Sequence, residues 1–257
     1  MNKAQWDAFV AFRDAFRTKC AEWNTQFSDV LKPLQKAAAK KDTPDYPLET
    51  AVVYNRAFDD VTPADTIRYF VIGDNPGKDE QLAKNNRYLV GQSGKIAAGF
   101  FARNPEFKTD FRKNVLILNK TPVHTAKTSH LKSVTKAGGK DIQDLVFTSQ
   151  AWMAEQTARL HTALCAAADS ENPAPELWLV GYAELKGKGL FLHYRDVLRA
   201  TYPADVWQRV YVFQHFSMNR FLIDLKNYRE SHTTLSLQDA VHALGEQHRC
   251  EIFTPIS

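Results

Sequence analysis

Residues 68–94 read RYFVIGDNPGKDEQLAKNNRYLVGQSG, and this stretch decides the fold that we expect for the chain. It opens with an apolar run over residues 69–72, which is rich in aromatic and β-branched side chains. Such a run is typical of a strand buried on both faces in a parallel sheet. It stops at the turn Gly73-Asp74-Asn75-Pro76-Gly77. Ligands of open α/β sheets bind at the carboxyl ends of strands, so this turn is the first candidate for a binding site.

A second glycine-rich loop, Gly91-Gln92-Ser93-Gly94, leads into a helical pattern over residues 95–102. Backbone N–H groups at a helix N-terminus favour an anion, which makes this loop a possible phosphate contact. The loop is not a nucleotide-binding P-loop, because Ile96 follows Lys95 where a serine or threonine is required. It is not a nucleophile elbow either, since the glycine after Ser93 comes one residue too early.

Three further apolar runs, at residues 114–118, 177–180 and 209–213, are separated from the first and from one another by helical patterns. Short strands that alternate with helices predict a three-layer α/β/α sandwich with a central four-stranded parallel sheet. Residues 51–54 are a candidate for a further short strand. The helical patterns span residues 4–38, with a break or kink at Pro33, and residues 95–102, 141–168, 191–200, 221–230 and 236–249.

The composition describes a mildly basic chain of 257 residues with a formal net charge of +4, which permits a polyanionic partner without requiring one. We expect one domain over residues 1–257, in which residues 1–45 form a helical N-terminal extension. Cys20, Cys165 and Cys250 lie far apart, so neither a disulfide framework nor a cysteine-based metal site is expected. The sequence shows no membrane span and no signal peptide, and we expect a soluble, cytoplasmic protein.

The segment 119–140 is strongly basic, with five lysines (120, 127, 132, 136 and 140), two histidines and no acid. Two interpretations have equal weight. The segment is either a solvated loop or a basic flap beside the strand ends that contacts phosphates.

Polar residues follow three of the four predicted strands: Asp74 and Asn75 after the first, Asn119 after the second, and His215 with Ser217 after the last. Right-handed crossovers place all strand carboxyl ends at one edge of the sheet, so these side chains are expected to converge on one pocket. Each has a structural alternative, as a turn residue, a capping residue or a core histidine. Their equivalent positions favour a functional role.

These residues resemble three motifs of the uracil-DNA glycosylase superfamily: Gly73-Asp74-Asn75-Pro76-Gly77, then Asn119, then His215-Phe216-Ser217. Residues 88–94, YLVGQSG, are similar to a motif of the iron–sulfur branches, although the four cluster cysteines are absent. The resemblance covers about residues 50–230. It implies a monomeric, monofunctional DNA glycosylase of base excision repair that acts on uracil or another deaminated base in DNA, without a metal or cofactor.

The resemblance implies catalytic roles for Asp74, Asn75 and His215. Asn75 would orient a water through its carbonyl, and Asp74 would supply a carboxylate if its side chain turns inward. A neutral His215 would donate a hydrogen bond to the base O2 as negative charge collects there.

The same resemblance implies a base-binding set and a DNA-binding set. Leu89 stands where the family has an aromatic residue that stacks on the base, so Tyr88 is the alternative stacking partner. The base-binding residues are Asn119, Tyr88, Leu89, Gly73 and Gly77. The DNA-binding residues are Ser93, Lys95, Lys120, Ser217, Met218, Asn219 and Arg220.

Two other function classes remain open at this stage. The chain is alternatively a non-catalytic DNA-binding member that kept the fold, or an enzyme that acts on free nucleosides or nucleotides in the same pocket. Phe216, in place of the family's usual proline, leaves room for the first of these.

Overall fold

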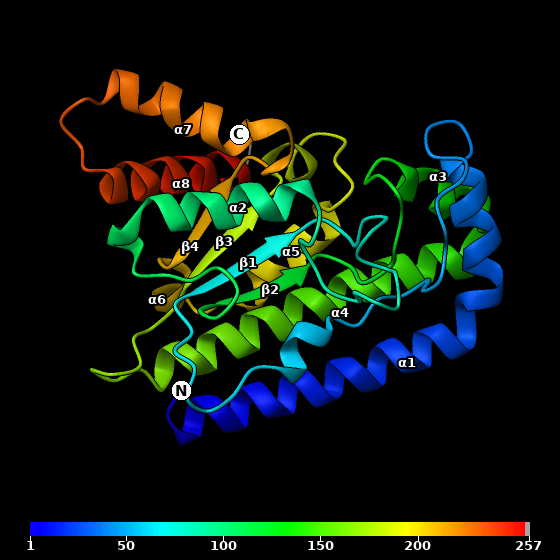
Figure 1. The fold of residues 1–257 in the computed structure, drawn as a ribbon, viewed down its shortest axis with the longest axis horizontal. Coiled ribbons are helices and arrows are strands. Elements are labelled where there is room, and N and C mark those ends of the chain that lie inside the picture. Colours follow the sequence, from blue (N-terminus) through cyan, green and yellow to red (C-terminus); the bar gives the residue numbers. More distant parts are fainter. Residues whose placement is uncertain (255–257) are drawn as a thin grey trace.

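The computed structural model, which describes residues 1–254, has a central sheet of four parallel strands (Figure 1). The strands are β1 (Tyr69–Gly73), β2 (Val115–Asn119), β3 (Glu176–Val180) and β4 (Val210–Phe213), in the order β2-β1-β3-β4. The predicted α/β class and the four predicted strands are therefore confirmed. Each strand is a nearly continuous apolar run because both faces of the sheet are covered by helices.

Helices connect and cover the strands. The α-helices are α1 (Lys3–Ala39), α2 (Gln92–Arg103), α3 (His130–Ala137), α4 (Gly139–Ala166), α5 (Leu192–Thr201), α6 (Ala204–Trp207), α7 (Arg220–Ser231) and α8 (Leu237–Phe253), and the short 3-10 helices are η1 (Arg56–Asp59), η2 (Pro105–Phe107), η3 (Tyr182–Leu185) and η4 (Ser217–Asn219). The six predicted helical segments lie within a few residues of α1, α2, α4, α5, α7 and α8. Helix α1 continues through Pro33 and bends in its C-terminal part (Figure 1).

Aromatic contacts define the two helical layers. On one face, Trp178 of β3 stacks on Phe101 of α2, with ring centroids 5.3 Å apart. On the other face, Phe70 of β1 meets His161 of α4 at 5.1 Å. Figure 1 shows α2, α7 and α8 on one side of the sheet and α4 with α1 on the other. Successive side chains along a strand point to opposite faces of the sheet. The strands therefore bury apolar groups against helices on both faces, which gives the predicted three-layer arrangement.

The N-terminal helix α1 packs on the rest of the chain through aromatic side chains. Phe16 stacks on Trp152 of α4 with ring centroids 5.8 Å apart, and Phe12 meets Phe58 of η1 edge to face at 5.7 Å. These side chains belong to the same hydrophobic core as the strands. The N-terminal helix, expected as an extension, therefore packs against the domain and contributes to its hydrophobic core.

Two local predictions are wrong. Residues 51–54 do not form a strand: Val52 makes only an isolated bridge with Val123, because the Asn24 side chain of α1 bonds both backbone groups of Val52. The segment 119–140 is not a loop throughout, since its residues 130–137 form α3. Leu131 and Val134 are buried on one face of α3. Their helical spacing is hard to recognise in the sequence because lysines surround them.

Within residues 1–254, no helix is both long and apolar enough to cross a membrane. In the same part of the chain, no three His, Cys, Asp or Glu side chains gather into a group that could hold a metal ion.

Candidate functional site

A cleft of about 550 Å³ lies at the carboxyl ends of the strands. It is lined by residues from the loops that follow all four strands, and Asp74, Asn75, Asn119 and His215 are all among them. The topology predicted that these four strand-end residues converge. The remaining lining residues are Gly77, Glu80, Leu89, Ser93, Thr125, Ala126, Lys127, Thr128, Gly181, Ala183, Glu184, Gln214, Ser217, Met218 and Arg220.

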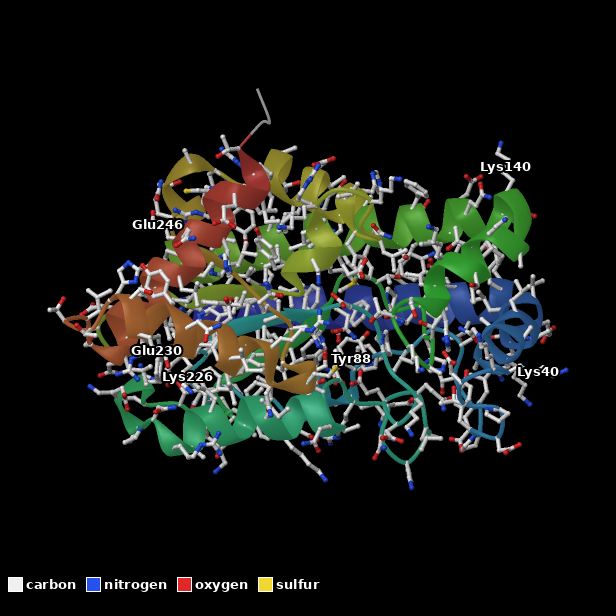
Figure 2. All side chains as sticks on the ribbon, turned by 90° about the horizontal axis from the view of Figure 1, so that it is seen from above. Lys40, Tyr88, Lys140, Lys226, Glu230 and Glu246 are labelled. Carbon is white, nitrogen blue, oxygen red and sulfur yellow. The ribbon has the colours of Figure 1, made fainter. Side chains whose placement is uncertain are left out.

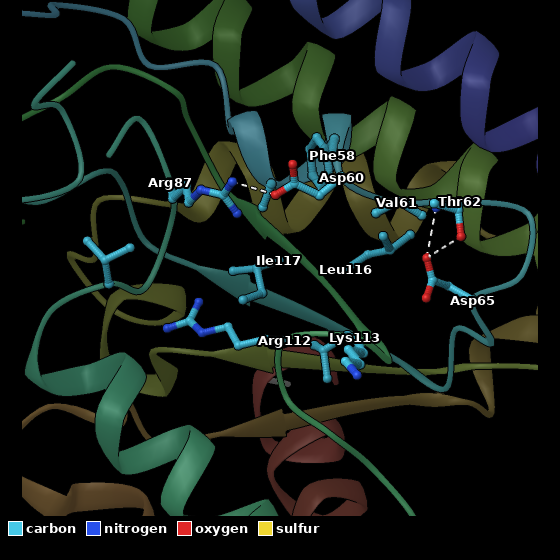
Figure 3. A pocket seen from close by; sticks show the side chains of 13 residues that line it. Phe58, Asp60, Val61, Thr62, Asp65, Arg87, Arg112, Lys113, Leu116 and Ile117 are labelled. Atoms are coloured by element: carbon cyan, nitrogen blue, oxygen red, sulfur yellow. Dashed lines mark hydrogen bonds and ion pairs between the residues drawn. The ribbon is translucent and has the colours of Figure 1, made fainter. Parts of the chain in front are cut away.

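A second cavity, of about 630 Å³, runs along the edge strand β2 (Figure 3). Its charged groups are largely occupied by neighbours: Asp60 pairs with Arg87, Asp65 bonds the backbone and hydroxyl of Thr62, and Arg112 donates to the carbonyls of Tyr88 and Leu89. The strand-end cleft instead leaves buried polar atoms without partners. We therefore take the strand-end cleft as the candidate site.

The amide of Asn75 is held in one orientation. Its Nδ2 donates to Thr125 Oγ1 at 2.8 Å and to the carbonyl oxygen of Val123 at 3.2 Å. A carbonyl only accepts hydrogen bonds, so the amide cannot be flipped without loss. Oδ1 is then left buried without a hydrogen-bond partner in the described structure. A buried acceptor of this kind is suited to a water or a ligand donor.

Asn119 contributes the opposite group, a donor. Its Nδ2 is buried and has no partner among the described residues. Gly73 makes this position possible, because a Cβ there would lie 2.5 Å from Asn119 Oδ1. Gly73 does not line the cleft; its role is to let Asn119 lie against the end of β1.

Ser217 fixes the tautomer of His215. The backbone N–H of Ser217 donates to Nδ1 at 3.0 Å, and the Ser217 hydroxyl lies 2.7 Å from the same nitrogen. Nδ1 is therefore an acceptor, and the neutral ring carries its proton on Nε2. Burial lowers the pKa of His215, with the Asp74 carboxylate opposing and the cations Lys120 and Arg220 adding to the effect. The site thus holds a neutral imidazole with a free Nε2–H donor.

Asp74 turns into the cleft and pairs with Lys120. Lys120 Nζ donates to Asp74 Oδ1 at 2.6 Å and to the Val180 carbonyl at 2.6 Å. Burial lowers the pKa of Lys120, and the Asp74 carboxylate opposes this shift. Gly181, at φ +99°, leaves room for the pair, because a Cβ there would lie 2.5 Å from Asp74 Oδ1.

The predicted DNA contact of Lys120 is wrong. Its exposed fraction is 0%, so it cannot reach a phosphate. A lysine that follows a strand looks solvated in the sequence, but here the Asp74 carboxylate and two strand-end carbonyls satisfy all three ammonium donors. Lys120 positions Asp74.

Glu80 is a cleft residue that the sequence did not single out. It lies between the two glycine-rich loops, and burial raises its pKa to about 7, against smaller opposing effects of backbone hydrogen bonds from Gly77 and Leu89. In the sequence it belongs to the charged run Lys78-Asp79-Glu80, which is typical of a solvated turn. The sequence offered one indication that Glu80 belongs to the site: it lies six residues after Asp74 in the same loop.

The predicted stacking role of Tyr88 is wrong. The residue is 1% exposed, and its hydroxyl donates to the Val53 carbonyl at 2.6 Å. Figure 2 shows Tyr88 within the body of the molecule, whereas Lys140 points outward at its end. Leu89 lines the cleft instead, with a left-handed backbone at φ 52°. No phenylalanine, tyrosine or tryptophan lines this cleft, all of whose lining residues are described.

The rim of the cleft carries two further predicted DNA contacts, Met218 and Arg220, and Asn219 lies between them in the chain without lining the cleft. Met218 and Asn219 are consecutive left-handed residues at φ 54° and 57°, and Met218 is 69% exposed. Arg220 begins α7 and lines the cleft. Two adjacent left-handed residues without glycine store backbone strain, a common property of functional loops.

Ser93 also lines the cleft, in the first turn of α2, whose N-cap Gly91 makes no side-chain cap. Free N–H groups therefore remain there for an anion. Lys95 is exposed in the same turn but does not line the cleft. Ser217 does not keep the predicted phosphate contact, because both its hydroxyl and its N–H bond His215.

Comparison of the chain with protein-family models, curated proteins and solved structures gives no match.

Proposed function

We propose that this chain is a DNA glycosylase, similar to the uracil-DNA glycosylase superfamily, that hydrolyses the N-glycosidic bond of uracil or another deaminated base in DNA. One observation carries the proposal. The unpartnered Oδ1 of Asn75, the unpartnered Nδ2 of Asn119 and the Nε2 donor of His215 serve a single cleft at the strand ends.

Asn119 gives the cleft its preference for a deaminated base. Its Nδ2 donates to a ring carbonyl such as uracil O4, and its Oδ1 accepts from N3–H. Cytosine presents an amino group and an unprotonated N3 at these two places, so both hydrogen bonds would be lost. Sites built around such hydrogen bonds reject a mismatched ligand strongly, because their buried polar groups are then left unpaired.

His215 assists departure of the base. When the glycosidic bond breaks, its electron pair moves onto the base and negative charge collects on the carbonyl beside the broken bond. A preorganised Nε2–H donor stabilises this charge. Because burial lowers the pKa of His215, the ring is neutral at pH 7, and its Nε2–H stabilises the charge through a hydrogen bond without transferring the proton.

The attacking water is held by Asn75 and deprotonated by Glu80. Asn75 Oδ1 accepts a hydrogen bond from the water, whose oxygen bonds to the sugar carbon while one proton passes to a carboxylate. Glu80 suits this role because its pKa of about 7 makes it a stronger base than an ordinary carboxylate. Asp74 lines the cleft and its partner Lys120 does not, so the negative end of this ion pair faces the cationic sugar.

Entry of the base requires that it leave the DNA stack. Met218 at the rim is the apolar side chain available to fill the gap. Arg220 and the free N–H groups at the start of α2 contact the flanking phosphates.

A base-release assay tests the proposal. It uses uracil, hypoxanthine and xanthine in single- and double-stranded DNA, with the Asn75→Ala, His215→Ala double variant as the reference. Release above the reference supports the enzyme. Release no greater than the reference for every substrate ends the proposal.

The lack of a phenylalanine, tyrosine or tryptophan in the cleft favours one alternative, a non-catalytic DNA-binding protein. Stacking on a phenylalanine, tyrosine or tryptophan ring holds a flipped base, and this cleft has apolar side chains without rings, such as Leu89 and Met218, in its place. Tight, salt-dependent DNA binding without an abasic product would support this alternative. Turnover of free nucleosides or nucleotides without DNA affinity would instead indicate a nucleoside-processing enzyme.

A further inference from the structure

A pocket of about 450 Å³ lies between α3, α4 and the loop that leads from η3 to α5. It shares no residue with the strand-end cleft. The two are neighbours, however, because Glu184 of the cleft accepts a hydrogen bond from the N–H of Leu190 in this pocket at 3.0 Å. The lining residues are Leu131, Lys132, Thr135, Lys136, Gln143, Val146, Phe147, Gln150, Lys188, Gly189, Leu190, Leu192 and His193.

The floor of the pocket is apolar. Leu131 and Val146 form part of it, and Phe147 of α4 is 53% exposed with its ring 5.0 Å from that of His193. An aromatic ring that stays open to solvent beside a hollow exposes apolar surface that a bound apolar group would remove from water. Because the ring borders a hollow lined by other apolar side chains, the surface is contiguous, which is typical of a binding site.

The rim of the pocket is basic. Lys132 and Lys136 lie one turn apart on α3, and Lys188 comes from the η3–α5 loop. All three are exposed and form no ion pair within residues 1–254, and no acid lines the pocket. By contrast, Lys127 of the same basic segment is paired with Asp42. The pocket therefore combines unneutralised positive charge with an apolar floor.

We propose that this pocket binds an acidic peptide segment of a partner protein, with one large apolar side chain on the Phe147 floor and Asp or Glu carboxylates at the three lysines. Charge complementarity selects the acidic partner. A nucleic acid would place phosphates at the lysines and a base on the Phe147 ring. The aliphatic side chains of Leu131 and Val146 beside that ring, however, give the polar edge of a base no hydrogen-bond partner, whereas an apolar side chain needs none. A partner bound here lies next to the Glu184 side of the cleft, and this site is independent of the proposed glycosylase activity.

The test measures fluorescence anisotropy of labelled octapeptides with the full chain. Each peptide has aspartates around one central residue, which is phenylalanine, tryptophan, leucine or alanine. A single-stranded oligonucleotide of equal charge is the comparison. We expect a Kd on the order of 10 µM for the best apolar peptide and about tenfold weaker binding for the alanine peptide, since one anchor is worth at least about 1.4 kcal/mol.

Variants locate the site. Phe147→Ala and the triple variant Lys132→Gln, Lys136→Gln, Lys188→Gln should each weaken peptide binding about tenfold or more. Lys140→Gln is the matched control, because Lys140 is an exposed lysine of the same basic segment outside the pocket and should leave binding unchanged. Thermal unfolding checks that each variant folds.

Three results overturn the proposal. The first is that no apolar peptide binds more tightly than the alanine peptide. The second is that peptide binding persists in both pocket variants. The third is that these variants weaken oligonucleotide binding and leave peptide binding intact, which would make the surface part of a nucleic-acid contact.

Discussion

Two histidines, His161 and His215, show how the interior of this molecule differs from its strand-end cleft. Burial lowers the pKa of both. Both ring nitrogens of His161 are used: Nε2 donates to the Pro175 carbonyl at 3.0 Å, and Nδ1 accepts from the Tyr202 hydroxyl at 2.9 Å. His215 has only Nδ1 engaged, by Ser217.

The difference separates polar groups that stabilise the fold from polar groups that are kept for a ligand. In the α4 layer, each nitrogen of the buried imidazole has a protein partner, as expected where water is excluded. In the cleft, Asn75 Oδ1 and Asn119 Nδ2 are buried without one. Groups of the same chemical type therefore serve stability in one place and are available for recognition in the other, and substitutions should separate the two roles.

The largest effect is expected from breaking the buried ion pair that supports the cleft. Lys120→Met leaves Asp74 buried without its cation, and breaking one side of such a pair destabilises a protein by about 3–5 kcal/mol. Urea unfolding measures the loss. The double variant Lys120→Met, Asp74→Asn should recover most of it. If the single and double variants are equally unstable, the loss comes from packing of the Lys120 chain and not from the unpaired charge.

The two histidines should respond oppositely to substitution. His215→Asn removes the Nε2 donor, and loss of one such donor lowers the rate of base release about 10²–10³-fold with little change in unfolding temperature. His161→Asn should lower the unfolding temperature and leave the rate near that of the parent below the transition. Base-release kinetics and calorimetry on both variants check this. Equal rates in the two variants would remove His215 from the mechanism.

Glu80 should give the enzyme its pH dependence. A carboxyl with a pKa of about 7 accepts a proton only when ionised, so the single-turnover rate should rise as the pH increases from 6 to 8. Glu80→Gln should lower the rate about 100-fold at pH 8 and abolish this rise. Glu184→Gln is the matched control, since Glu184 also lines the cleft and bonds the Leu190 N–H. If the rate of Glu80→Gln depends on pH in the same way as that of the parent, the group that titrates is not Glu80.

The sequence predicted the sheet and the convergence of the strand-end residues because both depend on simple rules. Continuous apolar runs such as residues 69–72 indicate buried parallel strands, and parallel connections bring Asn75, Asn119 and His215 to one edge. The rest depends on local backbone and environment. Leu89 has a left-handed backbone, and the neighbouring Tyr88 side chain points into the core. The ion pair between Lys120 and Asp74 and the raised pKa of Glu80 arise only from the three-dimensional structure.

Stability against acid should reflect the interior histidines. Burial lowers the pKa of His161 and of His124 from 6.5 to about 4. Between these values the unfolded chain binds protons that the folded chain does not, so the free energy of unfolding falls as the pH is lowered from 6.5 towards 4. From pH 7 to 5 each histidine accounts for roughly 2 kcal/mol of this fall. Urea unfolding at the two pH values should show a smaller fall for His161→Gln; an unchanged fall would mean that this ring already accepts a proton in the folded state.

The smallest effect, and the sharpest comparison, concerns two asparagines that are both buried. Asn55 is satisfied, since its Nδ2 donates to the Ile117 carbonyl at 2.8 Å and its Oδ1 accepts from the Ala57 N–H at 3.2 Å. Asn119 leaves Nδ2 without a partner. Asn119→Leu removes an unsatisfied donor at similar volume and should raise the free energy of unfolding by about 1 kcal/mol while base release is lost.

Asn55→Leu is the matched control for this last substitution. It leaves the Ile117 carbonyl and the N–H groups of Ala57 and Tyr88 unpaired and should destabilise the protein by about 1–3 kcal/mol. Urea unfolding of both variants, together with the release assay, separates the two roles. If Asn119→Leu gains stability and loses activity, the unpaired donor of Asn119 destabilises the fold and is needed for binding the ligand. A loss of stability as large as that of Asn55→Leu would instead make Asn119 a structural residue and take base recognition away from it.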